Sequence, residues 1–333
     1  MTPPSDLQVS DRTTDPDPTR GLTRGGRAGR GDSVFRGVAL VAGLVVLAVL
    51  ALIVWAMFDK GRDAIRVSGI TFVTGDVWDP PNNTYGALAF IYGTLLSSLI
   101  ALILAVPVSI GIALFTIESV PRRLRRPVVS VIDLLAAVPS VVYGLWGILV
   151  FAPAIQGFYQ DIADTVGTWP GFSAVFGGNA SGTSFMTAGI ILALMMTPIV
   201  TSISREVITT VPSAQREAAY GMGATRWEVI RHAVLPWSRG GIVGGVMLGL
   251  GRALGETIAV ALVIGSTAQI TSHVFLPGYS IAAVIANEFG ESSGTHQSAL
   301  IAMGLLLFAI TIVVNIAARS LVTRFDRRAQ GVT

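Results

Sequence analysis

The sequence of 333 residues is 52% hydrophobic and only 13% charged, with a formal net charge of +3. About a quarter of the residues of an ordinary soluble domain are charged, so this composition excludes that class and predicts that a lipid bilayer surrounds most of the chain. The chain has no cysteine, which excludes disulfides, thiolate metal sites and cysteine nucleophiles, and its three histidines lie far apart, so no metal site is expected.

The first 34 residues are rich in Pro, Gly, Asp and Arg and nearly free of large apolar side chains. Such a segment cannot bury a core and is predicted to be a disordered tail. Six runs of about 20 apolar residues follow, the length that crosses a hydrocarbon core. They are 37–58, 87–115, 128–151, 186–205, 240–264 and 298–318. The chain is therefore predicted to be an all-α membrane protein with six transmembrane helices, a first external loop ending at residue 86 and a C-terminal tail over 319–333.

Basic residues are distributed unequally between the two sets of loops. Nineteen arginines lie in the N-terminal tail, the 118–127 loop, the 205–239 region and the C-terminal tail. The opposite loops, 59–86, 152–184 and 265–297, contain only Lys60, Arg62 and Arg66. Because cytoplasmic loops keep the excess of Lys and Arg, both termini are predicted to be cytoplasmic. Lys60 also lacks the glycine spacing of a nucleotide-binding loop, so no ATP site of that type is expected in this chain.

The second, third and fourth predicted spans each contain a proline. These are Pro107, Pro139 and Pro198. Broken helices often mark transport sites in membrane proteins, and Ser140, Tyr143 and Thr197 would then expose polar groups to an internal route. Prolines in membrane spans are as often packing kinks, so both interpretations stay open.

A polar segment, residues 212–238, separates the fourth and fifth spans. Pro212 fits the start of a helix over 213–220. Gly221 and Gly223 supply the left-handed conformation that ends a helix, and Thr225 followed by Glu228 has capping-box spacing for a second helix. That second helix is predicted to run to Pro236. The result is two short helices joined by a glycine bend.

The fifth span contains Arg252 and Glu256, one helical turn apart within apolar sequence. Each charge costs roughly 2.5–3.5 kcal/mol at a helix centre on insertion scales, so such residues normally face a cavity or a partner. A guanidinium presents a planar fork of donors suited to phosphate or carboxylate, which makes Arg252 the first candidate for substrate contact. Glu256 would neutralise it or accept a proton-bearing oxygen. The alternative is an interhelical salt bridge to Asp133 of the third span.

The 212–238 segment resembles the EAA loop of ABC-transporter permeases. The matching positions are Glu217, Ala218, Ala219, Gly223, Leu235 and Pro236. In that family the loop docks into a cleft of a separate ATPase dimer and transmits its closure. The resemblance implies that Glu217 holds the loop in register, that Ala218 and Ala219 allow close approach, and that Gly223 makes the bend. It also implies that residues 87–318 form a type I ABC permease (MetI-like) domain.

Three further stretches resemble the PstC family of phosphate-importer permeases. They are residues 72–94 with their Trp-Asp-Pro segment, 134–147, and Gly-Arg-Ala-Leu-Gly-Glu-Thr at 251–257. This resemblance implies inorganic phosphate as substrate and a complex with a PstA-like permease, two PstB-like ATPases and a PstS-like phosphate-binding protein. ATP and Mg would then bind to the ATPase, and this chain would bind no cofactor and no nucleic acid.

Other readings of the sequence remain. An ABC permease for sulfate, molybdate or an organic solute would share the EAA loop, although the Trp-Asp-Pro segment and the 251–257 stretch favour the phosphate family. An ion-coupled transporter or channel has no reason to carry an EAA loop. An enzyme is not expected, because no paired carboxylates, metal cluster or activated nucleophile occur at a suitable spacing.

Overall fold

The structure is a computed structural model that describes the backbone of residues 28–330 and, apart from Arg122, the side chains of residues 33–320. The chain divides into two compact units, residues 1–55 and 56–333. Most of the predicted disordered tail lies outside the described residues, but helix α1 (Ala28–Ser68) already includes its last residues. At the other end, α14 (Gly294–Gln330) extends through most of the predicted C-terminal tail.

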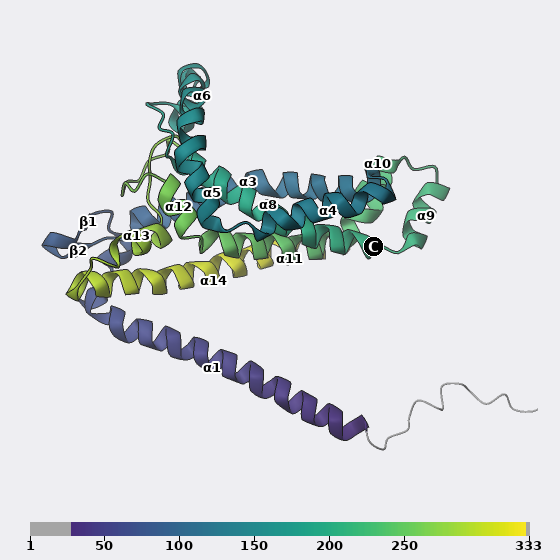
Figure 1. Cartoon of the computed structure of the whole chain (residues 1–333), viewed down its shortest axis with the longest axis horizontal. Helices are drawn as coiled ribbons and strands as arrows, with labels where there is room; N and C mark the ends of the chain where they lie inside the picture. The colour runs from purple at the N-terminus through teal and green to yellow at the C-terminus, as the bar shows by residue number, and fades with distance from the viewer. Residues whose placement is uncertain (1–27, 331–333) are drawn as a thin grey trace, which may run out of the picture. The chain divides into compact units, whose positions relative to one another are not determined.

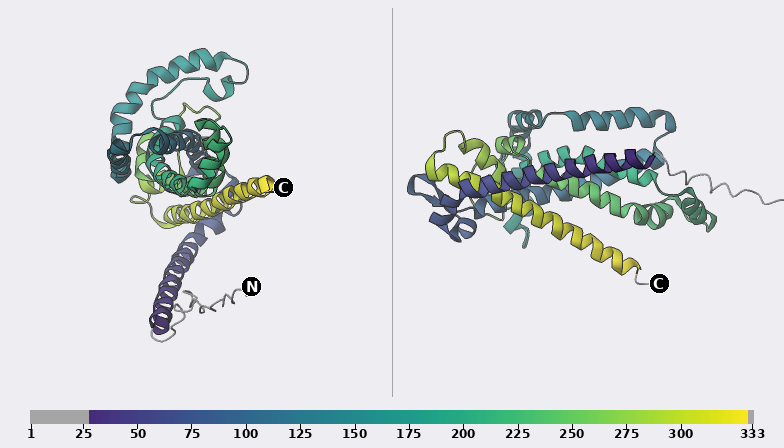
Figure 2. Two further views of the ribbon diagram at one scale, coloured as in Figure 1. Left: turned by 90° about the vertical axis from the view of Figure 1, so that its right-hand side faces the viewer. Right: turned by 90° about the horizontal axis from the view of Figure 1, so that it is seen from below.

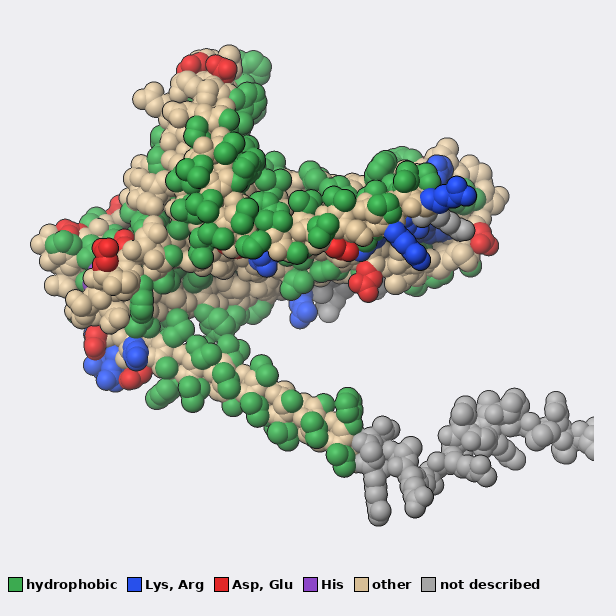
Figure 3. Space-filling model, viewed as in Figure 1, with side chains coloured by type: hydrophobic (Ala, Val, Ile, Leu, Met, Phe, Trp, Pro, Cys, Tyr) green, Lys and Arg blue, Asp and Glu red, His purple; other side chains and the backbone are tan. Residues whose placement is uncertain are grey.

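Six helices of the described part of the chain are long and apolar enough to cross a membrane, which confirms the predicted number. They are Ser33–Ser68, Leu88–Ser119, Ser140–Thr168, Phe185–Thr209, Arg226–Leu254 and Gly294–Ser320. Hydrophobic side chains cover much of the surface along the second unit, and Lys and Arg side chains gather near α9 and α10 (Figure 3). The third and fifth of these helices differ from the predicted spans.

The predicted third span, 128–151, is not one helix. α4 (Arg122–Ala137) ends before Pro139, and α5 (Ser140–Trp146) begins after it. Val138 adopts an extended conformation with ψ 127°, as expected of a residue before proline, and Pro139 has no N–H with which to continue the helix. The membrane-length helix therefore starts at Ser140. It continues through a π-turn (η4, Gly147–Phe151) into α6 (Ala152–Thr165), so the first half of the predicted 152–184 loop is helical, and α6 projects from the bundle (Figures 1 and 2).

The other two span prolines lie inside continuous helices. Pro107 is within α3 (Leu88–Leu114) and Pro198 within α8 (Phe185–Thr209). These two helices pack along each other, and side-chain hydroxyls link them close to the two prolines. Ser109 Oγ donates to the carbonyl oxygen of Thr197 at 3.2 Å. Thr201 Oγ1 donates in return to the carbonyl oxygen of Ser109 at 3.3 Å. Neighbouring helices and Ser or Thr side chains commonly satisfy the backbone around such prolines.

Helix α11 (Leu235–Leu254) packs on α8 through a row of glycines spaced four residues apart. A Cβ added at Gly241 would lie 2.4 Å from Val207, one at Gly245 3.1 Å from Ile203, and one at Gly249 2.9 Å from Val200. Side chains at these positions would push the helices apart, so the glycines permit their close approach.

The opposite end of the bundle from α9 and α10 is capped by short elements. A hairpin of β1 (Trp78–Asp79) and β2 (Thr84–Tyr85) follows α2 (Thr71–Thr74) and encloses the 3-10 turn η2 (Pro80–Asn82). Trp78 Nε1 donates to Glu288 Oε2 at 3.0 Å, and His296 Nε2 lies 3.0 Å from the same oxygen. These contacts join the hairpin to α13 (Ile281–Glu288) and to the start of α14. Burial raises the pKa of the Tyr85 phenol above its ordinary value.

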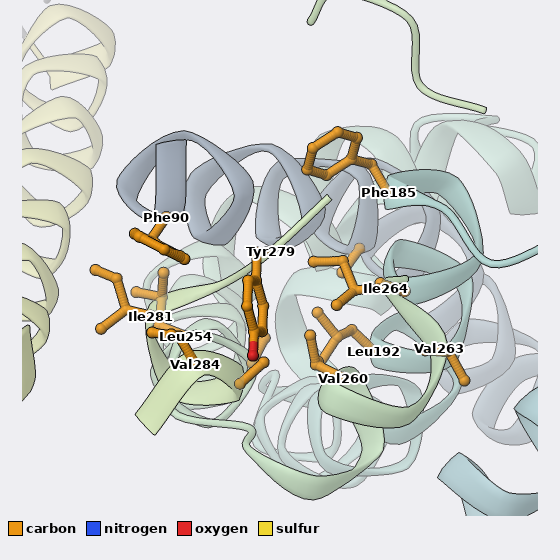
Figure 4. Close-up of a cluster of buried hydrophobic side chains, with 14 of the residues drawn as sticks. Phe90, Phe185, Leu192, Leu254, Val260, Val263, Ile264, Tyr279, Ile281 and Val284 are labelled. Atoms are coloured by element: carbon orange, nitrogen blue, oxygen red, sulfur yellow. The ribbon is translucent and has the colours of Figure 1, made fainter. Parts of the chain in front are cut away.

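The remaining connections run through this end. A 3-10 turn (η5, Val166–Thr168) and α7 (Ser173–Phe176) lead from α6 towards α8, and the segment between α12 (Ile258–Val263) and α13 returns into the core. Phe275 of that segment stacks on Tyr159 of α6 at 4.5 Å between ring centroids. Figure 4 shows Tyr279 among Phe90, Ile264 and Ile281, so this end of the bundle has a packed apolar core.

Candidate functional site

The EAA segment forms two helices that meet at a glycine bend, as predicted. α9 (Ser213–Gly221) begins directly after Pro212, whose φ is −58°. Gly223 has a φ of +86°, which a glycine adopts without steric strain. Gly221 is the last residue of α9 and does not take the left-handed conformation. Gly223 alone therefore makes the left-handed turn of this bend.

Thr225 caps the second helix with the predicted capping box. Its backbone N–H donates to Glu228 Oε2 at 2.7 Å, and the Glu228 N–H donates to Thr225 Oγ1 at 3.4 Å. α10 (Arg226–Val229) then passes through a π-turn (η6, Ile230–Val234) into α11 without interruption. The prediction that this helix stops at Pro236 is wrong. Pro236 lies in the first turn of α11, and the wide turn before it accommodates a residue that cannot donate a backbone hydrogen bond.

One carboxylate that the sequence reasoning missed holds α9 against the bundle. Glu118, in the π-turn η3 (Phe115–Ser119) at the end of α3, pairs with Arg216 of α9, with Oε1 and Nη1 2.6 Å apart. Arg226 Nη2 donates to the backbone oxygen of Glu118 at 2.8 Å. The sequence signal was an acidic residue at the start of the arginine-rich 118–127 loop. Its partner is 98 residues away, which local patterns cannot show.

A small apolar cluster lies beneath the same segment. Its buried members are Ala113, Ile208, Val211, Val229 and Val234, and Ala219 packs against it. The other residues of the EAA pattern face outwards to different degrees: Glu217, Ala218 and Pro236 are exposed, and Leu235 is half-buried. Within the described residues Glu217 forms no hydrogen bond or ion pair, so the contact that holds α9 to this chain is made by its neighbour Arg216.

The predicted fifth span is interrupted between its two charged residues. α11 ends at Leu254, and Gly255 to Thr257 separate it from α12, so Arg252 and Glu256 do not share a helix face as predicted. Glu256 Oε1 instead accepts from the Ala259 N–H at 3.5 Å, at the start of α12. The physical reason is the Gly-Glu-Thr sequence: glycine readily ends a helix, and a carboxylate satisfies the unpaired N–H groups of the next one.

Arg252 has no ion pair among the described residues. The alternative partner, Asp133, lies instead 4.0 Å from Arg205 Nη2, with its own side chain 53% exposed. Arg252 is exposed and lines a cavity of about 990 Å³ beside the open face of α11. A permanent cation that has no counter-ion among the described side chains and lies at a cavity wall is suited to binding an anion.

The other predicted pathway residues do not line this cavity. Tyr143 OH donates to the carbonyl oxygen of Leu135 at 3.0 Å and bridges the break between α4 and α5. Thr197 Oγ1 donates to the carbonyl oxygen of Ala193 at 2.8 Å within α8. Ser140 is the half-buried first residue of α5. The structure therefore brings neither Ser140, Tyr143 nor Thr197 to the cavity of Arg252.

Comparison with known proteins identifies the family. The profile of the binding-protein-dependent transport system inner membrane component family matches residues 105–330. The chain belongs to this family. Members that it resembles include the phosphate transport system permease protein PstC of Xylella fastidiosa strain 9a5c, 43% identical over 93% of this chain and 97% of the relative. PstC of Haemophilus influenzae is 43% identical over 89% and 94%, and PstC 2 of Mycobacterium tuberculosis 42% identical over 88% and 92%.

Solved structures of this transport class have the same fold. A chain of a bacterial alginate ABC transporter, solved in complex with an alginate pentasaccharide-bound periplasmic protein, aligns with a TM-score of 0.59 at 18% identity. The alignment covers 89% of this chain and 97% of that one. A second structure of a bacterial ABC transporter that imports alginate aligns with a TM-score of 0.59 at 19% identity. With the family match, this likeness shows a permease of the type I ABC fold, whose described part contains six membrane-length helices.

Proposed function

We propose that this chain is the permease subunit of an ATP-driven phosphate importer and forms part of the path taken by inorganic phosphate. The observation that carries the proposal is its 43% identity to a PstC permease across almost the full length of both chains. The unpaired guanidinium of Arg252 at a cavity wall supplies a fitting chemistry, since Arg binds phosphate through two parallel N–H bonds.

In this proposal Arg252 contacts the phosphate in the cavity, and Glu256, which lies beyond the helix break and outside the cavity lining, accepts a hydrogen bond from a protonated phosphate oxygen as the anion passes the end of α11. Glu256 is held near the end of α11 by the break that follows Arg252 and by the Ala259 N–H. A carboxylate that can only accept discriminates against an anion with no proton to donate. The pair would therefore favour hydrogen phosphate over sulfate at neutral pH.

The partners in this proposal are a PstA-like permease, a PstB-like ATPase dimer that binds ATP and Mg, and a PstS-like phosphate-binding protein, all within membrane lipid. The EAA segment presents apolar side chains that a partner would cover: Tyr220, Met222 and Trp227 are 45%, 83% and 61% exposed. The nineteen arginines on one set of loops support placing this segment and both termini in the cytoplasm. This chain would hydrolyse no ATP and bind no cofactor of its own.

Uptake of radiolabelled phosphate by cells tests the proposal. Cells that express the chain with its partners should import phosphate, and deletion of the ATPase should abolish that uptake. Arg252→Gln should lower uptake at least tenfold, whereas Arg123→Gln, which removes an exposed arginine of α4 away from the cavity, should leave it nearly unchanged. Phosphate uptake that persists without the ATPase, or uptake of sulfate in place of phosphate, would refute the proposed function.

A further inference from the structure

The cavity beside Arg252 has a second cationic wall. It lies between α11 and α14, and α14 contributes Asn315 and Arg319 to its lining. These two residues are one helical turn apart and share a helix face. Neither arginine has an ion pair among the described residues, and no Asp or Glu lines the cavity. Among the side chains that the structure describes, the cavity therefore carries two positive charges with no acidic partner.

Three glycines of α11 leave room for this cavity along that helix. A Cβ added at Gly240, Gly244 or Gly251 would meet no heavy atom within 4 Å. These glycines lie on a different face of α11 from the row that packs on α8, where an added Cβ meets a neighbour at every position. One face of α11 is thus closed against a helix and another is open along the cavity.

The two arginines lie at different heights in the bundle. α11 starts at the EAA segment, and α14 ends on that side, so the helices run antiparallel (Figure 1). The lining stretches along α11 from Gly240 to Arg252, about 18 Å at a rise of 1.5 Å per residue. Because late residues of α14 face early residues of α11, Arg319 lies nearer the EAA end than Arg252.

We propose that Asn315 and Arg319 form a second anion-binding station, to which phosphate passes from Arg252 on its way to the EAA side. This inference rests on the proposed function. Conduction needs sites that bind well enough to admit an ion and weakly enough to release it. Arg319 is exposed next to the end of its membrane-length helix, and in this proposal it holds the anion weakly enough to release it. Asn315 donates its amide N–H groups to phosphate oxygens beside it.

The absence of native cysteine allows a direct test in the assembled complex, reconstituted in uncharged phosphatidylcholine nanodiscs. Val243→Cys places the only thiol of this chain in the cavity wall, and Ile316→Cys places one on an exposed position of α14 outside the lining. Each is treated with an anionic sulfonatoethyl or a cationic trimethylammonioethyl thiosulfonate, and the ratio of the two rates is measured on this chain. Clefts lined by one sign of charge concentrate counter-ions about tenfold or more.

We expect an anion-to-cation rate ratio about tenfold higher at residue 243 than at residue 316, and slowing of both reactions at residue 243 by inorganic phosphate. Arg319→Gln in the Val243→Cys chain should lower the ratio at least threefold. A ratio equal at the two positions, or unchanged by Arg319→Gln, would overturn the proposal. Protection by phosphatidylglycerol nanodiscs but not by free phosphate would also overturn it, because the cavity would then hold a lipid headgroup.

Uptake measurements separate this inference from the proposed function. Arg319→Gln should reduce phosphate uptake about tenfold at equal membrane abundance, and Arg319→Lys, which keeps the charge, should restore at least half of it. If the wild type imports phosphate and Arg319→Gln imports it equally fast, the second station is wrong and the proposed function stands. If the wild type imports no phosphate, the proposed function fails, and the rate ratios at residue 243 still decide whether the cavity binds anions.

Discussion

The ion pair between Glu118 and Arg216 should control how firmly the EAA segment is held. Glu118→Ala removes a 2.6 Å charge-assisted hydrogen bond whose side chains are only 17% and 24% exposed. Hydrogen bonds to charged groups contribute about 1.5–3 kcal/mol, and partial exposure favours the lower figure. A loss of about 1.5 kcal/mol corresponds to roughly tenfold more frequent opening of α9. Amide hydrogen exchange of residues 213–229 in the purified chain should therefore speed up about tenfold.

Glu217→Ala is the matched control for this experiment. It removes the same charge from the residue next to Arg216, but Glu217 has no partner among the described residues. Exchange in the EAA segment should then change less than twofold, while coupling to the ATPase should suffer if the family role of Glu217 holds. Faster exchange in Glu217→Ala combined with unchanged exchange in Glu118→Ala would refute the assignment of Glu118 as the residue that holds α9.

Three further substitutions test other parts of the structure. Gly241→Ala should destabilise the detergent-solubilised protein by about 1–3 kcal/mol, because the added methyl group overpacks against Val207. Gly244→Ala, at an open position, should stabilise it by up to about 1 kcal/mol through helix propensity. Equal thermal unfolding midpoints for the two variants would contradict the packing described. Thr225→Ala should cost about 0.5–2 kcal/mol at the start of α10, seen as faster exchange of residues 226–229 alone. Trp78→Phe removes the indole donor to Glu288 and should speed proteolysis of the hairpin over residues 78–85 without altering exchange in α9.

Local sequence patterns predicted the elements whose causes are local. The capping box of Thr225 and Glu228 and the left-handed Gly223 depend on a few neighbouring residues, and both are present as expected. The number of spans followed from the apolar runs alone. The arginine count also gave a topology, which stays a prediction because the arrangement of helices does not reveal the side of the membrane.

Features decided by distant contacts were not predictable in this way. Of three span prolines only Pro139 breaks a helix, whereas Pro198 lies in α8 beside hydroxyl contacts with α3 that a single sequence does not display. The pairing of Glu118 with Arg216 and of Asp133 with Arg205 likewise depends on which helices become neighbours. The interruption after Arg252 did have a local signal, since Gly-Glu-Thr separates two apolar runs. The prediction joined these two apolar runs into one span over 240–264 and so missed the break.

The continuous helical path from α10 through the π-turn η6 into α11 connects the EAA segment to Arg252. One helical path of 29 residues, Arg226–Leu254, starts at the capped bend and carries Arg252 in its last turn. At 1.5 Å per residue this path is about 42 Å long. The π-turn η6 and Pro236 lie in the first half of this path, and the break at Gly255 separates its far end from α12. A displacement of the bend would therefore reach Arg252 along a continuous helical path, without crossing a loop.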